Sequence, residues 1–249
     1  MTNEPARYYP RFSKAGDDKK ILDFYDSHEH KNVLKRNAAL LKEMISSGAV
    51  ILIEDATGKI VAASITYPYT AKDANGNEEV KWHEIGTTRC TLNGYGLVDA
   101  MVSMQALRTF VVEPPSDRFI AHMITTPVQN MAKNLGFREF TPLKEVFNLK
   151  AKMVPGNNDP QEKKDWYQLG IEGMPVLARA LVKLYDNPVI EHPRTHEKIV
   201  LDFSRSNFCQ MLMPEIRVLA AANLGDVDKP DLSKGLQKQQ KELIRKFFH

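Results

Sequence analysis

The sequence predicts an α/β protein, with a mixed and mostly antiparallel sheet, helices on both faces of that sheet, and a mainly helical C-terminal extension. Three observations lead to this prediction. Strand-like apolar runs alternate with helical periodicity in a fixed order through residue 140. A loop with two glycines joins a strand to a helix at residues 93–98. After residue 141 the composition changes, and prolines and asparagines gather.

The first 140 residues predict the order strand, two helices, three strands, helix, strand, helix, strand. Gly58 and the pair Asn75-Gly76 mark turns, so the strands on either side of each turn are expected to pair as antiparallel hairpins. Asp17 and Asp18 can cap the first helix. The expected strands include residues 8–13, 49–55, 60–69 and 81–90, and the expected helices include 19–27, 32–46 and 97–109.

Residues 154–161 (VPGNNDPQ) predict a linker or long loop, which divides the chain into a domain at 1–150 and an extension at 151–249. Within the extension, residues 166–185 predict one helix that Pro175 kinks or divides. Its apolar residues are too many for a lone exposed helix, so we expect residues 161–249 to pack on the first domain. A strand at IVLDF and a helix at 208–222 follow.

Composition excludes several classes of protein. The 249 residues carry a net charge of +3, too little to favour nucleic-acid binding by charge alone. The two cysteines lie far apart in sequence, which gives neither a disulfide framework nor a metal spacing. The apolar runs are too short to cross a membrane and the N-terminus has no signal-peptide core. These features predict a cytoplasmic protein without a metal.

The loop NGYGLV is typical of a site for a phosphate-bearing cofactor. The first amides of a helix have no internal partners and the helix dipole is positive there. Gly94 and Gly96 let the backbone approach a ligand where a side chain would block it. A second strand–helix–strand segment, FIAHMITTPVQNMAKNLGFREF, begins at residue 119.

These two segments resemble the GNAT superfamily of acyl-CoA-dependent N-acyltransferases over about residues 8–141. The family's pyrophosphate loop reads Gln/Arg-x-x-Gly-x-Gly/Ala, often with an extra glycine. Here Asn93 stands at the first position, Gly94 at the extra glycine, Gly96 at the central glycine and Val98 at the last position. The family's fourth helix ends in Tyr-Glu-Lys-Leu-Gly-Phe, of which AKNLGF keeps the last three residues and has Ala132 at the tyrosine.

The resemblance implies a GNAT-like fold and an acyl group, acetyl by default, that passes from acyl-CoA to an amine by direct attack. The acceptor is not identified. Cofactor contacts are expected at the end of the strand 81–90, in the glycine loop, and at the start of the helix in the segment that begins at residue 119. The expected residues are Thr88, Cys90, Asn93, Gly94, Tyr95, Gly96, Leu97, Val98 and Thr125. Cys90 is expected to pack or to contact pantetheine, not to form an acyl-enzyme.

Two residues are candidates for the general base that the resemblance implies. Glu84 lies on the fourth strand, and alternation places it on one face with Trp82, Gly86 and Thr88, whose amide would face the thioester. The alternative is that Glu84 is a solvated strand carboxylate. His122 is the second candidate, although a histidine between isoleucines is more often a packed residue.

Departures from the family motifs leave the activity open. Val98 replaces a small residue, Asp99 adds a negative charge at the helix start, and Ala132 cannot protonate a leaving thiolate. Two alternatives to an active enzyme with an amine acceptor follow. One is an inactive GNAT-fold binding or structural module that acts through residues 161–249, as a homo-oligomer or with a protein partner. The other is a nucleic-acid-modifying enzyme tethered by the basic tail at 234–249.

Overall fold

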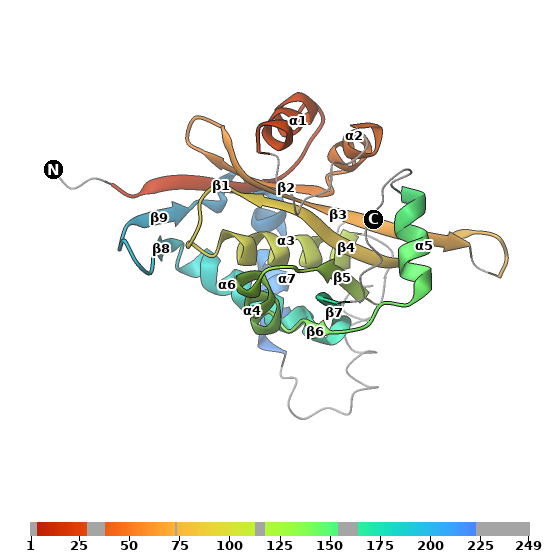
Figure 1. Cartoon of the computed structure of the whole chain (residues 1–249). Coiled ribbons are helices and arrows are strands. Elements are labelled where there is room, and N and C mark those ends of the chain that lie inside the picture. The colour runs from red at the N-terminus through yellow and green to blue at the C-terminus, as the bar shows by residue number, and fades with distance from the viewer. Residues whose placement is uncertain (1–3, 29–37, 73, 113–117, 154–163, 223–249) are drawn as a thin grey trace.

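The computed structural model describes residues 4–28, 38–72, 74–112, 118–153 and 164–222 (Figure 1). Within these residues, nine strands form one sheet in the order β6-β7-β5-β4-β3-β2-β1-β9-β8. The first four strands pair as antiparallel neighbours, whereas β4–β5 and β1–β9 are parallel. The strands are β1 Ala6–Phe12, β2 Val50–Asp55, β3 Ile60–Lys72, β4 Glu78–Cys90, β5 Arg118–His122, β6 Arg138–Glu139, β7 Trp166–Gly170, β8 Val189–Glu191 and β9 Lys198–Leu201.

Helices cover both faces of this sheet, as the sequence predicts. One buried cluster joins α1, α2 and α5 to one face of the sheet, and a second cluster joins α3, α4, α6 and α7 to the other face. In Figure 1, α1 and α2 lie above the sheet and α3 lies below it. The helices are α1 Asp18–Ser27, α2 Ala38–Ser46, α3 Leu97–Val112, α4 Thr126–Asn134, α5 Lys144–Met153, α6 Met174–Asp186 and α7 Asn207–Ala221, with short 3-10 turns η1 Ile171–Gly173 and η2 Phe203–Arg205.

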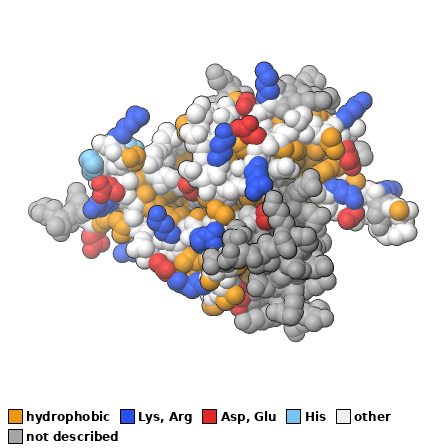
Figure 2. Space-filling view, turned by 90° about the horizontal axis from the view of Figure 1, so that it is seen from below, with side chains coloured by type: hydrophobic (Ala, Val, Ile, Leu, Met, Phe, Trp, Pro, Cys, Tyr) orange, Lys and Arg blue, Asp and Glu red, His pale blue; other side chains and the backbone are white. Residues whose placement is uncertain are grey.

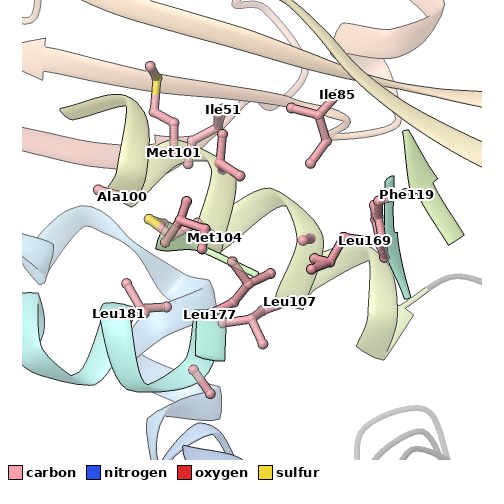
Figure 3. Close-up of a cluster of buried hydrophobic side chains, with 14 of the residues drawn as sticks. Ile51, Ile85, Ala100, Met101, Met104, Leu107, Phe119, Leu169, Leu177 and Leu181 are labelled. Atoms are coloured by element: carbon pink, nitrogen blue, oxygen red, sulfur yellow. The ribbon is translucent and has the colours of Figure 1, made fainter. Parts of the chain in front are cut away.

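The helix α3 lies at the centre of the lower layer. Its sequence, LVDAMVSMQALRTFVV, is apolar on nearly all sides, which is typical of a helix buried all round. Met101, Met104 and Leu107 lie between the sheet residues Ile51 and Ile85 above and the α6 residues Leu177 and Leu181 below (Figure 3). The helix that carries the glycine loop is therefore held by the sheet and by α6 together.

Residues after 150 continue the same sheet. Strand β7 lies between β5 and β6, and β9 extends the other edge by pairing with β1. Residues 164–222 pack on the rest of the chain as predicted, since α6 and α7 share a buried cluster with α3. The division at residue 150 stays a prediction, and the expected linker at 154–161 lies outside the described residues.

The predicted helix at 166–185 is wrong in its first half. Trp166–Gly170 is strand β7, η1 follows, and the helix α6 begins only at Met174. The run WYQLG carries aromatic side chains that suit a buried strand, and Pro175 lies in the first turn of α6, where its missing N–H costs nothing. Pro175 starts the helix and does not kink it.

Most other expected elements are confirmed to within a few residues. The described part of the second helix is Ala38–Ser46, because residues 29–37 lie outside the described range. Asp17 is the N-cap of α1, but its side chain makes no capping bond. Its carboxylate accepts hydrogen bonds from Arg11 at 2.7 and 2.9 Å and from the backbone N–H of Lys14 at 2.9 Å.

Candidate active site

Strands β4 and β5 are paired over a short stretch and then part. The parallel register joins His83 to Phe119 and Glu84 to Ile120, and no further pair is formed within the described residues. Beyond Glu84, β4 continues to Cys90, whereas β5 ends at His122. The two central strands therefore separate just past Glu84, on the side of the glycine loop.

A β-bulge in β4 lies at the point where the strands part. Ala63 pairs with Arg89 and Ile65 with Gly86, so Ser64 of β3 opposes two residues of β4, Thr87 and Thr88. Thr87 has φ 51°, in the left-handed region that a β-branched residue seldom adopts. Backbone strain is thus held at a defined position in the sheet.

Side chains from α1 and β3 hold the bulge in place. Tyr25 of α1 donates to the carbonyl oxygen of Thr87 at 2.9 Å, and the Tyr67 hydroxyl lies 2.8 Å from Thr87 Oγ1. On the other face, Ser64 Oγ lies 2.8 Å from Thr88 Oγ1. Because a trans peptide points its C=O and N–H in opposite directions, the Thr88 N–H is directed away from α1.

The bulge corrects the expectation that Thr88 shares a face with Glu84. The extra residue shifts the alternation, so Thr87 lies on the α1 face with Glu84, and Thr88 lies on the α3 face. Cys90 also packs in the α3 cluster. The glycine followed by two threonines in EIGTTRC was the available signal, because a glycine inside a strand often marks a bulge.

Glu84 is buried, with 4% of its surface exposed, so it is not the solvated carboxylate of the alternative interpretation. The Tyr69 hydroxyl donates to its Oε2. Gly86 has no side chain, and a Cβ added to it would lie only 3.3 Å from Glu84 Oε1. The Glu84 carboxylate therefore bends along the strand toward Gly86 and the bulge. Gly86 therefore provides the room in which this side chain lies.

His122 lies on the same face of the sheet as Glu84. Its ring stacks on Trp166 of β7, with centroids 4.9 Å apart and an interplanar angle of 9°. Ile120 and Trp166 belong to the α1 cluster, whereas Phe119 belongs to the α3 cluster, as the predicted alternation requires. The two candidate bases thus come from neighbouring strands on one face, and His122 is also a packed residue.

The glycine loop has the backbone that its sequence predicts. Gly94 and Gly96 have φ 86° and 65°, and Leu97 begins α3. The backbone N–H of Thr91 donates to Val61 at 2.8 Å and fixes the start of the loop to β3. A Cβ on Gly96 would meet only the Asp99 carboxylate, at 4.0 Å, so the approach to this glycine is open.

The other predicted cofactor contacts lie around this loop. Asn93 is exposed and Tyr95 is half-buried, while Leu97 is buried and Val98 packs against the lower core. Thr125 is exposed and is the N-cap of α4, which starts beside the end of β5. The structure places all of these residues at the loop or at the ends of β4 and β5.

The hairpin of β8 and β9 contacts the loop, which the sequence did not predict. His192 Nε2 would lie 2.2 Å from a Cβ on Gly94, so the imidazole lies against this glycine, which is otherwise exposed. Its ring also lies 5.0 Å from the Tyr95 ring, and the Tyr95 hydroxyl donates to Glu197 at 3.4 Å. The ring Nδ1 accepts the backbone N–H of Thr195 at 3.0 Å, so in the neutral imidazole the proton lies on Nε2.

Three ionisable groups near the site have shifted pKa values. Burial raises the pKa of the Cys90 thiol, which keeps it protonated, and its Sγ donates to the Leu92 carbonyl at 3.1 Å. Burial also raises the pKa of Asp99 in the first turn of α3. Arg89 lies beside the bulge, where burial lowers its pKa, and its Nη2 has no hydrogen-bond partner in the part of the chain that the structure describes.

Within the described residues there is no group of three His, Cys, Asp or Glu side chains that could hold a metal ion. None of the described helices is long and apolar enough to cross a membrane.

No protein-family model and no curated protein sequence matches the chain. Solved structures do match, at low identity. A Mycobacterium tuberculosis protein in complex with CoA is 19% identical, with a TM-score of 0.48 over 65% of this chain and 98% of that one. A putative acetyltransferase from Acinetobacter baylyi is 13% identical, with a TM-score of 0.47 over 68% and 94%. The GNAT family N-acetyltransferase YhbS from Escherichia coli, in complex with CoA, is 13% identical, with a TM-score of 0.44 over 73% and 88%.

The chain's own architecture agrees with the family that its sequence resembles. The mixed sheet has helices on both faces, its central parallel strands part next to a bulge, and a glycine loop at the end of β4 opens α3. Together these features give the chain a GNAT-like fold.

Proposed function

We propose that the protein is an acyl-CoA-dependent N-acyltransferase that passes an acyl group, by default acetyl, to an amine. The observation that carries the proposal is the strained bulge at Thr87, at the point where β4 and β5 part. The same strand leads into the glycine loop at the N-terminus of α3. One strand thus connects a helix N-terminus, where a phosphate would be favoured, to the polar groups around the bulge.

Acyl-CoA would bind along β4, with its pyrophosphate on the amides of residues 94–98. Asn93 provides no charge there, but the Nε2–H of His192 lies against the loop and offers a donor. The pantetheine arm would run between the parted strands toward the bulge. The Thr88 N–H would then donate to the carbonyl oxygen as it gains negative charge, the arrangement that usually contributes most to acyl transfer.

The reaction needs a neutral amine, and an alkylamine with a pKa of about 10.4 is mostly protonated at neutral pH. Glu84 is the favoured base because it is buried and bends toward the bulge; His122, on the same face, is the alternative. The base takes the ammonium proton, and the neutral nitrogen attacks the carbonyl carbon. The nitrogen then releases a second proton to the surrounding water, and the C–S bond breaks to give the amide and a thiolate. The leaving thiolate takes a proton from water or from the base, since Ala132 provides none.

An acceptor that carries a negative group would fit the α1 face. Arg89 pairs with Ala63 immediately beyond the bulge, and its interaction with Tyr25 places it toward α1, the face of Glu84. Its Nη2 is buried without a hydrogen-bond partner among the described residues, and a buried guanidinium gains most from a bidentate carboxylate. This favours amines with a carboxylate over neutral amines of the same size.

A thermal-shift titration with acetyl-CoA and free CoA tests the cofactor. At 100 times the dissociation constant, binding should stabilise the fold by about 2.7 kcal/mol. A rate assay on paired amines with and without a carboxylate then tests the acceptor. No shift at millimolar acetyl-CoA, with the protein folded, would refute the acyltransferase.

The contact of His192 with Gly94 favours one second function, an inactive GNAT-fold module. If the hairpin covers the loop permanently, phosphate cannot reach the amide of Gly94, and the neighbouring Asp99 adds to the obstruction. A folded protein that binds neither acetyl-CoA nor free CoA would indicate this module. The third reading, a nucleic-acid enzyme tethered by the basic tail, concerns residues outside the described range. An oligomer or partner contact through residues 161–249 stays a prediction.

A further inference from the structure

A cavity of about 420 Å³ lies at the opposite end of α3 from the glycine loop. It is formed by the end of β1, the C-terminal half of α3, η2 and the start of α7. Leu97, at the loop, and Val111, at the cavity, are about 21 Å apart along the helix at 1.5 Å per residue. We call it the β1–α7 cavity. Its lining residues are Arg11, Phe12, Ser13, Lys14, Arg108, Val111, Arg205, Asn207, Phe208, Met211 and Leu212.

The charged groups of this lining are all positive. Four are Lys or Arg, and none of the described lining residues is acidic. Arg11 is neutralised, because its guanidinium binds Asp17 and Glu54. Lys14 and Arg205 have no carboxylate partner among the described residues, and both are exposed. The cavity therefore has at least two positive charges that no described residue neutralises.

Aromatic rings hold two of the cations at the wall. The Arg205 guanidinium lies 3.7 Å from the centre of the Tyr9 ring, and that of Arg108 lies 5.1 Å from the Phe12 ring. Arg108 Nη2 also donates to the Ser47 carbonyl at 3.0 Å. Guanidinium groups held in this way lose less entropy when they bind an anion than freely rotating ones do.

Apart from Ser13 and Asn207, the rest of the wall is apolar. Phe12 and Phe208 pack edge to face, with ring centroids 5.5 Å apart, and Val111 and Leu212 are buried behind them. Met211 is 59% exposed at the rim. Figure 2 shows hydrophobic side chains exposed among basic and acidic ones over the lower face of the molecule. A volume of this size with mostly apolar walls and a few charged groups is typical of small-molecule sites.

We propose that the β1–α7 cavity binds a small amphipathic anion, with an aliphatic or aromatic body against Phe12 and Phe208 and a carboxylate or phosphate head between Lys14 and Arg205. The site is separate from the acyl-transfer site and does not depend on it. The unneutralised cations specify the sign of the head group, and the aromatic wall specifies an apolar body.

Calorimetry on the full chain tests this proposal with probes of equal chain length. Octanoate and octyl phosphate should bind saturably, and octanol at least tenfold more weakly, because it lacks the charge. The stronger of the two anions identifies the head group. Two results would overturn the proposal. One is that neither anion binds saturably at millimolar concentration, and the other is that octanol binds as tightly as octanoate and octyl phosphate.

Variants locate the binding. Lys14→Gln combined with Arg205→Gln should weaken octanoate at least tenfold, whereas Lys183→Gln, on an exposed position of α6, should not. Met211→Glu puts a carboxylate at the rim and should abolish binding; Val218→Glu, at an equally exposed apolar position on α7, should leave it unchanged. Each variant's melting temperature shows that the fold is intact. Equal affinity in Met211→Glu and Val218→Glu would place the anion elsewhere and refute the site.

Discussion

At the scale of single residues, the candidate site depends on backbone positions as much as on side chains. Thr87 adopts a left-handed conformation and Gly86 leaves room for the Glu84 side chain. Strain of this kind costs about 1–3 kcal/mol and persists only where neighbours impose it. Here Tyr25 and Tyr67 do so through hydrogen bonds to Thr87. A fold that keeps such strain at one point is consistent with a functional role for the bulge.

Glu84→Gln should lower the turnover on an amine acceptor by about 100-fold at neutral pH, a typical contribution of a general base. The amide is nearly isosteric but cannot take a proton, so the rate should recover as rising pH provides neutral amine. Steady-state kinetics from pH 6 to 10 measure this, with the affinity for acetyl-CoA as the control. A wild-type profile would leave His122 as the remaining candidate base.

Gly96→Asp should abolish CoA binding while the protein stays folded. The added carboxylate would stand in the open approach to the loop and repel a pyrophosphate. Gly76→Asp is the matched control, since Gly76 also has a positive φ and open space around it but lies at the tip of the β3–β4 hairpin. Calorimetry that gives equal CoA affinity in both variants would show that the loop is not the phosphate site.

Arg89→Gln should remove the preference for carboxylate-bearing amines. The paired-amine assay should show that the ratio of the two kcat/KM values falls at least tenfold, mainly through the KM of the anionic amine. Turnover on neutral amines should change little. A ratio that stays at the wild-type value would mean that Arg89 serves the fold and not the acceptor.

At the scale of elements, the hairpin of β8 and β9 and the glycine loop are positioned by each other. Gly94 has two reasons to be a glycine, its positive φ and the imidazole of His192 above it. A loop that looks from sequence like a cofactor motif thus also carries a packing constraint from a segment about one hundred residues away. A double-mutant cycle can separate the two constraints.

Gly94→Ala should lower the free energy of unfolding by about 2 kcal/mol. Alanine is strained at the positive φ of this position, and its Cβ would also collide with His192. In a His192→Ala background only the strain should remain, about 1 kcal/mol. Urea unfolding of the four proteins gives the coupling. Strictly additive effects would mean that the hairpin does not press on the loop.

Arg11 joins β1 to β2 and α1 by ion pairs with Glu54 and Asp17 at 2.6 and 2.7 Å. Burial alone would raise the pKa of both carboxyls, but hydrogen bonds from Arg11, with further help from the Lys14 N–H and from Lys20, lower them below their usual values. A lowered folded-state pKa stabilises the protein above the unfolded pKa of about 4, and this contribution is lost as the pH falls through the folded value.

Stability should therefore decline from about pH 5 downward, and Glu54→Gln should make the decline shallower while it destabilises the protein at pH 7. Removing one partner of a mostly buried pair costs about 3 kcal/mol. Denaturant unfolding at a series of pH values measures both effects. An unchanged slope in the variant would assign the acid sensitivity to other carboxyls.

At the scale of the whole molecule, one sheet and one lower core run through the part before residue 150 and the part after it. Strand β7 pairs with β5 on the side away from β4, and α6 packs on α3. A fragment of residues 1–150 would expose the apolar underside of α3 and leave β5 without β7. We expect it to be insoluble or far less stable than the full chain.

Limited proteolysis near residues 154–161, followed by chromatography and melting of the fragments, tests that expectation. The two pieces should stay together after cleavage, since the buried contacts between them remain. A released 1–150 fragment that is monodisperse and as stable as the full chain would show instead that the extension is an independent module.

The sequence by itself determined the elements of the first 140 residues, the glycine loop and both candidate bases. These follow from local rules, since periodicity, turn residues and positive-φ glycines act over a few positions. Only the tertiary structure decided three other features. Trp166–Gly170 forms a strand because β5 and β6 both pair with it, one on each side. The bulge in β4 moves Thr88 to the other face of the sheet. His192 reaches the loop because β9, which pairs with β1, places the β8–β9 hairpin beside it. Each depends on residues distant in sequence, and no local pattern encodes such contacts.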